Sequence, residues 1–425
     1  MAQSWRVQDT AIQMAVDSNR RSILLTPGPT EADPRVLAAM SHIAESHLAK
    51  PFAVTFGEVL TMLRRIFQCA DPRAQPFVIG GSGSLGWDFA ATNFIEPGED
   101  VLYLCPGFFD DAFEKCFSNY GARTKLLSVP FGCAPDLAIV EEELRSNKYK
   151  ALVVTHVDTS SGVLTQLKPL SALLKQHSPQ TLFIVDGVAS VGCEDMQFDG
   201  WSVDVCITGS QKALSCPPGV GIIMVSARAI DVALNRRGPP SWYSSLTRWL
   251  PIMQKYEHKE PAYFATPPTQ IIHALHVSLS TILASPLQQR YQMHKMKAGQ
   301  VRAALTGLGL TIIACQPETQ ANGVTAFWLP EGVTSEELRA KTLQKGVILA
   351  GGMHSQYGPR YARFGHMGFS VVNDSGAHID RGIQALRDVM LELYQANSFV
   401  EILPTGCKED FSFEAGESTL VLAEA

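Results

Sequence analysis

The sequence lacks the long apolar runs, the basic clusters and the paired cysteines that mark three common classes of protein. No apolar stretch in its 425 residues approaches the roughly 18–20 residues that span a bilayer. Charged residues make up only 18% of the chain, the net charge is −6, and no run of Lys and Arg occurs. We therefore expect no nucleic-acid or membrane partner. With 46% hydrophobic residues, the chain is expected to be a soluble globular protein with a large core.

The cysteines give no sign of a disulfide framework, because they number nine and include no C-x-x-C pair. Cys105, Cys206 and Cys315 lie in the apolar runs VLYLC, VDVCI and TIIAC, where buried free thiols are common. This usage predicts no metal site and favours a reducing, intracellular compartment. No targeting signal decides between cytosol, mitochondrion and peroxisome. Residues 1–22 contain acids that a mitochondrial leader usually lacks, and the final Ala-Glu-Ala is not a peroxisomal address.

Seven short apolar runs alternate with longer mixed segments over the first 230 residues. The runs are PFVIG (76–80), VLYLC (101–105), TKLLSV (124–129), ALVVTH (151–156), LFIVDG (182–187), VDVCITG (203–209) and GIIMVS (221–226). Helix-like stretches such as 87–94, 112–120 and 168–177 lie between them. Strands that are apolar throughout, and that alternate with helices, predict an α/β fold with a mostly parallel seven-stranded sheet covered on both faces.

A second pattern, typical of a smaller α+β domain, begins near residue 285. A long polar helix over about 286–307 precedes TIIAC, which we expect to be a strand, and then VTAFWL, a helix from Ser335, GVILAGG and RYARFGHMG. The predicted organisation is an N-terminal arm (1–22), a large domain (23–285), a small C-terminal domain (286–396) and a tail (397–425).

A glycine-rich turn follows the first predicted strand, where open α/β sheets place their ligands. The segment GSGSLG (81–86) matches G-x-G-x-x-G, but a dinucleotide site would need an acid after the next strand, and Asp100 stands before it. Ser82, Gly83 and Ser84 instead place small residues and free N–H groups at a helix N-terminus. That arrangement suits a single phosphate, and an ordinary tight turn is the alternative.

Two charged residues lie at or just after the ends of later predicted strands. Asp186 ends LFIVD, so a buried carboxylate there should face a cation such as a protonated pyridine nitrogen, or else cap a helix or form a salt bridge. Lys212 follows VDVCITG, 26 residues after Asp186, which is one further helix-and-strand excursion. Most lysines are surface charges, but a desolvated lysine can attack an aldehyde carbon to form an imine. A phosphate turn, a pyridine acid and an imine lysine together predict pyridoxal phosphate (PLP) as the cofactor.

These residues lie in motifs that resemble class V aminotransferases, within the fold-type I PLP-dependent transferases. The resemblance covers roughly residues 22–396 and is strongest to the fungal (yeast-type) alanine–glyoxylate aminotransferases. The motifs are LLTPGPT (24–30), GSGSLGWD (81–88), THVDTSSGVL (155–164), GSQKA (209–213), YSSLTRWLPIM (243–253), AYFATPP (262–268) and ILAGGMHSQYGPRYARFGHMG (348–368).

The resemblance implies a role for each residue around the cofactor ring. Lys212 forms the imine with the cofactor and then moves the proton between the substrate and the cofactor. Asp186 pairs with the pyridine nitrogen and Val188 packs on one ring face. Phe109 takes the other face, where many relatives place a tryptophan. Thr159 or Ser160 reaches the pyridine 3′-oxygen, and their adjacency leaves the choice open.

The resemblance also implies a shared active site in a homodimer. The phosphate is assigned to Ser82, Gly83 and Gln211, with Ser84 nearby. Tyr263 and Thr266 would reach the phosphate of the neighbouring subunit. Arg363 would bind the carboxylate of an amino or 2-keto acid, and the backbone around Gly28 would close the pocket. Arg360 and His366 are expected to be structural or rim residues.

The implied activity is the ping-pong transfer of an amino group from L-alanine to glyoxylate, which gives pyruvate and glycine. Serine–pyruvate or serine–glyoxylate transfer, or another amino donor, is the alternative. Gln211 stands where a desulfurase carries histidine, and Cys315 lies in an apolar run rather than a mobile loop, so a desulfurase is disfavoured. A nicotinamide enzyme is opposed by the position of Asp100, and a non-catalytic protein by the intact Lys212 and Asp186.

Overall fold

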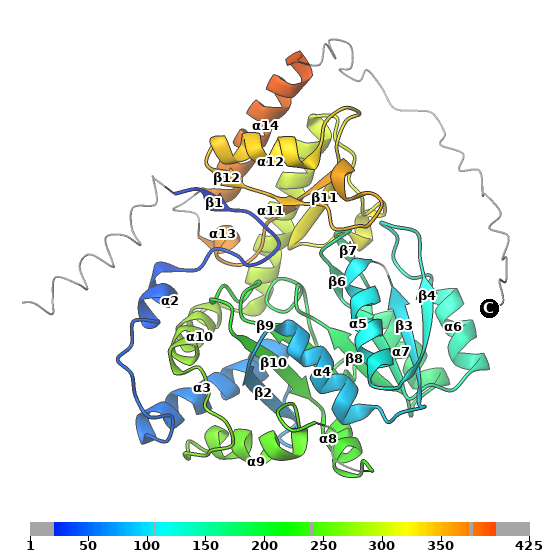
Figure 1. Ribbon diagram of the computed structural model, residues 1–425, viewed down its shortest axis with the longest axis vertical. Helices are drawn as coiled ribbons and strands as arrows, with labels where there is room; N and C mark the ends of the chain where they lie inside the picture. The colour runs from blue at the N-terminus through cyan, green and yellow to red at the C-terminus, as the bar shows by residue number, and fades with distance from the viewer. Residues whose placement is uncertain (1–20, 106, 238–240, 374–376, 397–425) are drawn as a thin grey trace, which may run out of the picture.

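A mixed sheet of seven strands, in the order β2-β10-β9-β8-β5-β3-β4, forms the centre of the larger domain (Figure 1). The computed structural model describes residues 21–105, 107–237, 241–373 and 377–396. Only β10 runs against its neighbours, so the predicted mostly parallel sheet is confirmed. The strands are β2 Gln75–Gly80, β3 Asp100–Cys105, β4 Arg123–Ser128, β5 Ala151–Thr155, β8 Leu182–Asp186, β9 Val205–Gly209 and β10 Val220–Val225.

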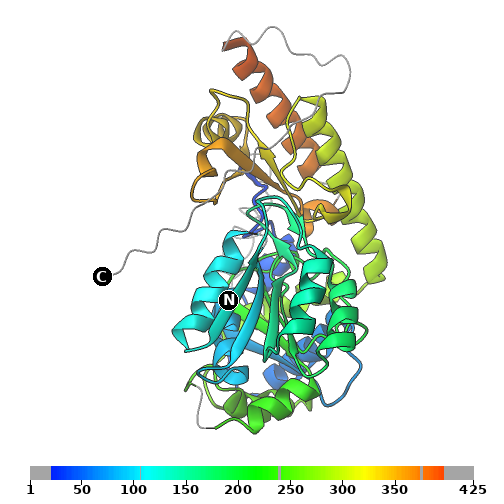
Figure 2. The same ribbon diagram turned by 90° about the vertical axis from the view of Figure 1, so that its right-hand side faces the viewer.

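Helices cover both faces of this sheet (Figures 1 and 2), which explains why its inner strands read as continuous apolar runs, whereas the edge strand β4 is partly exposed. Every residue of β5, β8, β9 and β10 is buried. The helices of this domain are α2 Pro34–Ala39, α3 Lys50–Phe67, α4 Gly83–Phe94, α5 Phe108–Asn119, α6 Leu137–Ser146, α7 Leu167–His177, α8 Ala227–Leu234, α9 Leu246–Glu257 and α10 Thr269–Ile282. A hairpin of β6 Val157–Asp158 and β7 Val163–Leu164 follows β5.

The smaller domain stands at one end of the larger one (Figure 2). Its antiparallel sheet has the order β11-β14-β13 and packs with long helices around a second hydrophobic core. Its elements are α11 Leu287–Gly307, η1 Pro317–Thr319, β11 Val324–Trp328, α12 Ser335–Gln344, β12 Val347–Ile348, β13 Ala350–Gly351, η2 Gly358–Arg360, β14 Tyr361–Gly365, α13 Phe369–Val372 and α14 His378–Ala396.

The chain enters through the smaller domain, which differs from the predicted boundary at residue 23. Strand β1 (Ile23–Leu24) pairs in parallel with β12, and both Ile23 and Leu25 belong to the second core. The next residues then run down to the larger domain, where the backbone N–H of Thr30 donates to the carbonyl of Gln211 at 3.0 Å. The entering chain therefore ties both domains together beside Lys212.

The run TIIAC was predicted as a strand with a buried thiol, and both expectations are wrong. Only an isolated bridge joins Ile312 to Phe327, and Cys315 is exposed. The run is apolar because Ile313 and Ala314 are buried, while the backbone turns away after them. Cys206 is fully buried as expected, and the side chain of Cys105 lies outside the described part of the chain.

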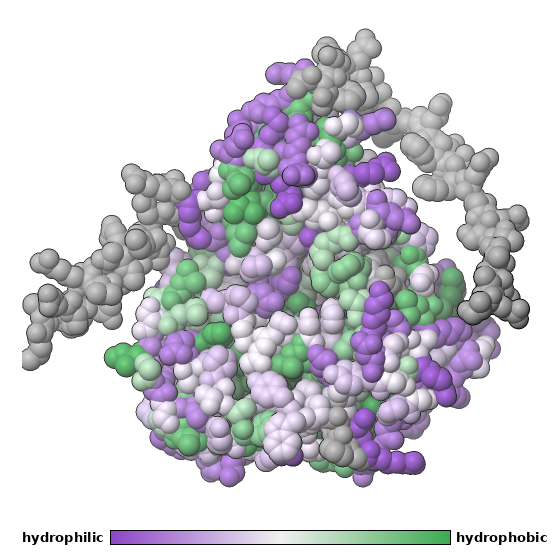
Figure 3. Space-filling model, in the orientation of Figure 1, coloured by the Kyte–Doolittle hydropathy of each residue, from purple (hydrophilic) through white to green (hydrophobic). Residues whose placement is uncertain are grey.

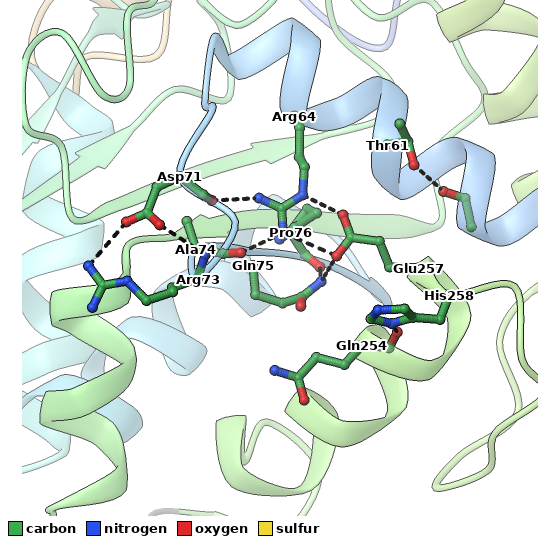
Figure 4. A network of polar contacts seen from close by, with 11 residues as sticks. Thr61, Arg64, Asp71, Arg73, Ala74, Gln75, Pro76, Gln254, Glu257 and His258 are labelled. Atoms are coloured by element: carbon green, nitrogen blue, oxygen red, sulfur yellow. Dashed lines mark hydrogen bonds and ion pairs between the residues drawn. The ribbon is translucent and has the colours of Figure 1, made fainter.

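An arginine network holds the amino end of β2 (Figure 4). Arg64 on α3 forms a short hydrogen-bonded ion pair with Glu257 on α9, and it donates to the carbonyls of Asp71 at 2.9 Å and Ala74 at 2.6 Å. Gln75 donates to the same Glu257 carboxylate at 3.1 Å. These contacts fix the start of the strand whose far end carries the glycine-rich turn.

The face in Figure 3 and the described helices show no sustained apolar band. On the face in Figure 3, hydrophobic residues form small separate patches among polar ones. Among the described helices, no single one is long and apolar enough to cross a membrane; α10 and α11 pass that test only when joined across their 87° bend.

Candidate active site

A cavity of about 160 Å³ opens at the carboxyl ends of β2, β5, β8 and β9. It brings together nine of the predicted site residues and four others. The lining residues are Ser82, Gly83, Ser84, Trp87, Phe109, Thr155, Val157, Thr159, Asp186, Val188, Ala189, Gln211 and Lys212. A larger cavity of about 580 Å³ lies near the amino ends of β8 and β9, and its lining includes neither Lys212 nor Asp186.

Lys212 lies in the turn after β9, enclosed by the entering chain. Its Nζ donates to the carbonyl of Pro27 at 2.6 Å, and the Thr30 hydroxyl donates to the carbonyl of Lys212 at 2.8 Å. A Cβ on Gly28, which has φ +125°, would lie 2.3 Å from Nζ, so only glycine fits there. Burial, helped by Arg363, lowers the pKa of Lys212 to about 8, against a smaller opposing effect of Asp186. About a tenth of such an amine is neutral at pH 7.

Asp186 closes β8 with its carboxylate 4% exposed and held by neutral donors. One oxygen accepts from the backbone N–H of Val188 and the other from the Trp87 indole, both at 2.8 Å. Burial raises the pKa of Asp186 to about 6, although both hydrogen bonds and Lys212 oppose the rise. A cation in the cavity would lower this pKa and remove the cost of the buried charge.

The glycine-rich turn begins α4, as predicted, with Ser82 as the N-cap. The Ser82 side chain makes no capping hydrogen bond, and Gly83 packs so closely on Val188 that a Cβ would lie 2.8 Å from its methyl group. A helix N-terminus with free N–H groups attracts an anion. Gln211 faces the same cavity, and its buried side-chain oxygen has no hydrogen-bond partner among the described residues.

The structure brings Thr159, and not Ser160, to the cavity. Ser160 is fully buried, and its hydroxyl donates a short hydrogen bond to Asp158 while accepting from the N–H of Phe108 at 3.2 Å. Asp158 also accepts from the N–H of Phe109 at 3.3 Å, which fixes the start of α5. Asp158 therefore positions both Thr159 and Phe109, and no motif in the sequence singles it out.

Arg363 lies on β14 beside the cavity, with 8% exposure. Its Nε donates to the carbonyl of Gly351 at 2.6 Å and its Nη1 to the carbonyl of Thr159 at 3.2 Å. Its Nη2 has no hydrogen-bond partner among residues 21–105, 107–237, 241–373 and 377–396. Burial lowers the pKa of this guanidinium, and its charge in turn lowers the pKa of Lys212. The site thus holds a positioned cation for a carboxylate.

Several predicted residues stand outside the cavity. Tyr263 is 61% exposed and Thr266 is exposed, and neither lines the cavity. Arg360 is exposed and its guanidinium lies 5.9 Å from the centre of the Trp328 ring. His366 is fully buried, with Nδ1 2.9 Å from the carbonyl of Asn322 and Nε2 2.7 Å from the hydroxyl of Thr325.

One cluster has ligand atoms spaced as in a metal site, within 4.8 Å of one another, but its groups already contact each other. His42, Glu45 and His273 lie together at the surface, away from the cavity. The two histidine rings stack with their centres 3.8 Å apart and their planes 13° apart. Glu45 already accepts a short hydrogen bond from His273. We interpret this cluster as a local ion pair.

The cavity fits pyridoxal phosphate. A buried carboxylate hydrogen-bonded only by neutral donors matches the pyridine nitrogen of this molecule, and a lysine amine matches its aldehyde. A helix N-terminus beside the Gln211 carboxamide, whose NH2 group can donate, matches its phosphate. Val188 and Phe109 line the cavity, as expected of residues that contact the ring. Fold and site thus define a fold-type I PLP-dependent enzyme.

Comparison with known proteins identifies the family. Residues 111–375 match the sequence profile of the aminotransferase class-V family. Alanine–glyoxylate aminotransferase 1 of Saccharomyces cerevisiae is 41% identical over 360 residues, which cover 82% of this chain and 93% of that protein. The structure of alanine–glyoxylate aminotransferase from Nostoc sp. has a TM-score of 0.80 at 28% identity and covers 87% of this chain and 95% of that one. Ureidoglycine–glyoxylate aminotransferase from Bacillus subtilis gives 0.79 at 28% identity, with 87% and 93% covered. The chain belongs to the class-V aminotransferases.

Each residue around the cavity has a separate role in this PLP-dependent aminotransferase. When bound, the cofactor supplies an electron sink that makes the α-hydrogen of an amino acid acidic. Asp186 would keep the pyridine nitrogen protonated, and Lys212 would move the proton at the substrate Cα. Arg363 would orient the substrate carboxylate beside Lys212. Trp87, which sequence reasoning missed, holds the Asp186 carboxylate in place.

Proposed function

We propose that this aminotransferase transfers the amino group of L-alanine to glyoxylate and so produces pyruvate and glycine. The observation that carries the proposal is the 41% identity to the alanine–glyoxylate aminotransferase of Saccharomyces cerevisiae over 93% of that protein. The site supports it, because one buried guanidinium next to a cavity of about 160 Å³ suits a small monocarboxylate. The activity makes glycine from glyoxylate, and the buried free thiols fit a reducing intracellular compartment.

The amino donor is the less constrained half of the reaction. All three of the relatives above are named for glyoxylate, whereas their printed donors are alanine and ureidoglycine. L-serine differs from L-alanine by one hydroxyl group, which a small pocket discriminates only about 10²-fold when it offers no matching hydrogen bond. A donor panel of L-alanine, L-serine and L-aspartate therefore separates the proposed function from its alternatives.

Each half-reaction can be followed separately in the PLP-loaded enzyme by its visible absorption band. We expect L-alanine, added without a keto acid, to remove this band, and glyoxylate alone to restore it. L-serine should react with a lower kcat/KM than L-alanine. L-aspartate should have the lowest kcat/KM of the three, because Arg363 can bind only one of its two carboxylates. A band that L-alanine leaves unchanged while L-serine or L-aspartate removes it would overturn the proposed donor and keep the family. The products should be verified as pyruvate and glycine by mass spectrometry.

We further propose that two copies of the chain share each active site. Tyr263 and Thr266 lie between α9 and α10, on a segment exposed in the single chain. Tyr263 packs against His47 with ring centres 5.2 Å apart, and Leu48 beside it is 48% exposed. Trp242, at 68% exposure, lies near Phe264 in the same area. Exposed aromatic and aliphatic side chains gathered in this way suit a protein interface.

Subunit complementation tests the shared site. A dimer should sediment as two chains of 46.3 kDa. The Tyr263→Ala variant should bind the cofactor about tenfold more weakly, as expected for one lost hydrogen bond to an anion. In a mixed dimer with Lys212→Ala, one site has both defects and the other has none. At a PLP concentration low enough to leave the Tyr263→Ala dimer largely empty, mixing the two variants should therefore restore up to about half of the wild-type activity per active dimer. A monomeric mass, or no recovery on mixing, would contradict a shared site.

A further inference from the structure

Two thiols from different domains lie side by side. Cys133 is in the connection between β4 and α6, and Cys315 is in the segment between α11 and β11. Their sulfur atoms are 3.7 Å apart, and both cysteines are free. The N–H of Cys315 donates to the carbonyl of Gly132 at 3.3 Å, so the two backbones are in direct contact. Backbones this close are within the span of a disulfide.

The contact is built into the fold. Gly132 has φ +90°, and a Cβ there would lie 2.3 Å from the carbonyl oxygen of Ile313. The neighbouring residue, Phe131, packs on the smaller domain, with ring centres 4.7 Å from His354 and 5.5 Å from Tyr361. The packing of Phe131 and the close approach at Gly132 hold the two segments against each other, so the thiols lie together as part of the packed interface between the domains.

The two thiols differ in their exposure to solvent and therefore to an oxidant. Cys315 is exposed, whereas Cys133 is partly buried. Burial, together with the neighbouring thiol, raises the pKa of Cys133. Cys193 and Cys206, in contrast, are wholly buried among apolar residues. Because oxidation needs access to a thiolate, Cys315 is the sulfur that reacts first and Cys133 is the sulfur that resolves the product.

We propose that Cys133 and Cys315 form a redox modification site at which a hydroperoxide closes a disulfide between the two domains. The Cys315 thiolate attacks one oxygen of the peroxide, the O–O bond breaks, and a sulfenic acid and an alcohol (water, for hydrogen peroxide) result. The Cys133 sulfur then attacks the Cys315 sulfur, the S–O bond breaks, and the hydroxide leaves as water with the Cys133 proton. Two thiols lose two electrons and two protons, and the peroxide gains them.

The bridge would join the larger domain to the strands that carry the substrate arginine. Ile312 bridges to Phe327 of β11, and Ala326 of β11 faces Arg363 of β14. The cross-link closes a loop of 182 residues, which should raise the midpoint of thermal unfolding. The proposal does not depend on the amino donor or acceptor of the enzyme.

Intact mass spectrometry of the PLP-loaded full chain tests the site. After treatment with hydrogen peroxide and blocking of the remaining thiols, the protein should have lost about 2 Da and regain it with dithiothreitol. Peptide mapping without reduction should show a peptide that joins Cys133 to Cys315. Cys315→Ser should abolish the bond, and Cys133→Ser should leave a sulfenic acid that dimedone traps at Cys315. The Cys116→Ser variant, which removes a partly buried thiol outside the pair, should form the bond normally.

Three results would overturn the proposal. One is an unchanged mass at peroxide concentrations that oxidise free glutathione. Another is a gain of oxygen at Cys315 without a cross-linked peptide in the wild-type chain. The third is a cross-link that persists in Cys315→Ser, because it would place the disulfide elsewhere.

Discussion

The Lys212→Ala variant is expected to lose at least about 10⁴-fold in kcat for transamination while it stays folded. Lys212 is the only lysine that lines the cavity formed by the described residues. Burial brings the pKa of its amine to about 8, so the amine can both accept and return a proton near neutral pH. The substitution removes the amine that moves the proton at the substrate Cα, and no other described residue that lines the cavity carries an amine.

A structural role and a catalytic role for Lys212 predict different results. The decisive measurement is the exchange of the α-hydrogen of L-alanine with deuterium from solvent, which reports proton transfer directly. We expect exchange to stop in Lys212→Ala and to return in part when a small primary amine is added. The Lys168→Ala variant, in which an exposed lysine on α7 is removed, should exchange normally. Exchange within about tenfold of the wild-type rate in Lys212→Ala would rule out this role.

The central sheet could be predicted because both of its faces are buried. A strand covered on both faces has to be almost wholly apolar, which holds for the strands of this sheet other than the edge strand β4. Each of the seven runs became a strand within one or two residues of its expected bounds. The same argument singled out Asp186 and Lys212, because each is a charged residue at or just after the end of an apolar run. Parallel strands place their carboxyl ends at one edge, so order along the chain was enough to bring these two residues together.

The contacts around these two residues could not be predicted, because they depend on directions that order along the chain does not fix. Trp87 reaches Asp186 only because α4 turns that face toward the sheet. Thr159 and Ser160 are neighbours, and the buried carboxylate of Asp158 decides which of them lines the cavity.

The errors in the smaller domain have the same origin. An apolar run such as TIIAC can bury two residues without becoming a strand, as Ile313 and Ala314 do. The pairing of β1 with β12 joins segments more than 300 residues apart, as the partners Ile23 and Val347 show. No local pattern indicates such a pairing, because strand register is set by tertiary contacts.

Loss of the Arg363 guanidinium is expected to lower kcat/KM for L-alanine by about 10²- to 10³-fold, or about 3–4 kcal/mol. Carbonyls of Gly351 and Thr159 hold this buried guanidinium through Nε and Nη1. A carboxylate bound there replaces water with a charge-assisted hydrogen bond in a poorly hydrated place. Arg363→Lys should recover only part of the loss, because an ammonium cannot reproduce the planar fork.

The Arg360→Ala variant is the matched control, because this exposed arginine lies three residues away and contacts the Trp328 ring instead of the cavity. Its kcat/KM should stay within about threefold of the wild-type value, as expected for a surface contact. The sharper comparison uses ethylamine, which is L-alanine without its carboxylate. If Arg363 binds the carboxylate, Arg363→Ala should lose activity toward L-alanine but not toward ethylamine, so the preference for alanine should collapse. An equal loss on both amines, with an unchanged cofactor band, would show that Arg363 only supports the fold around Thr159.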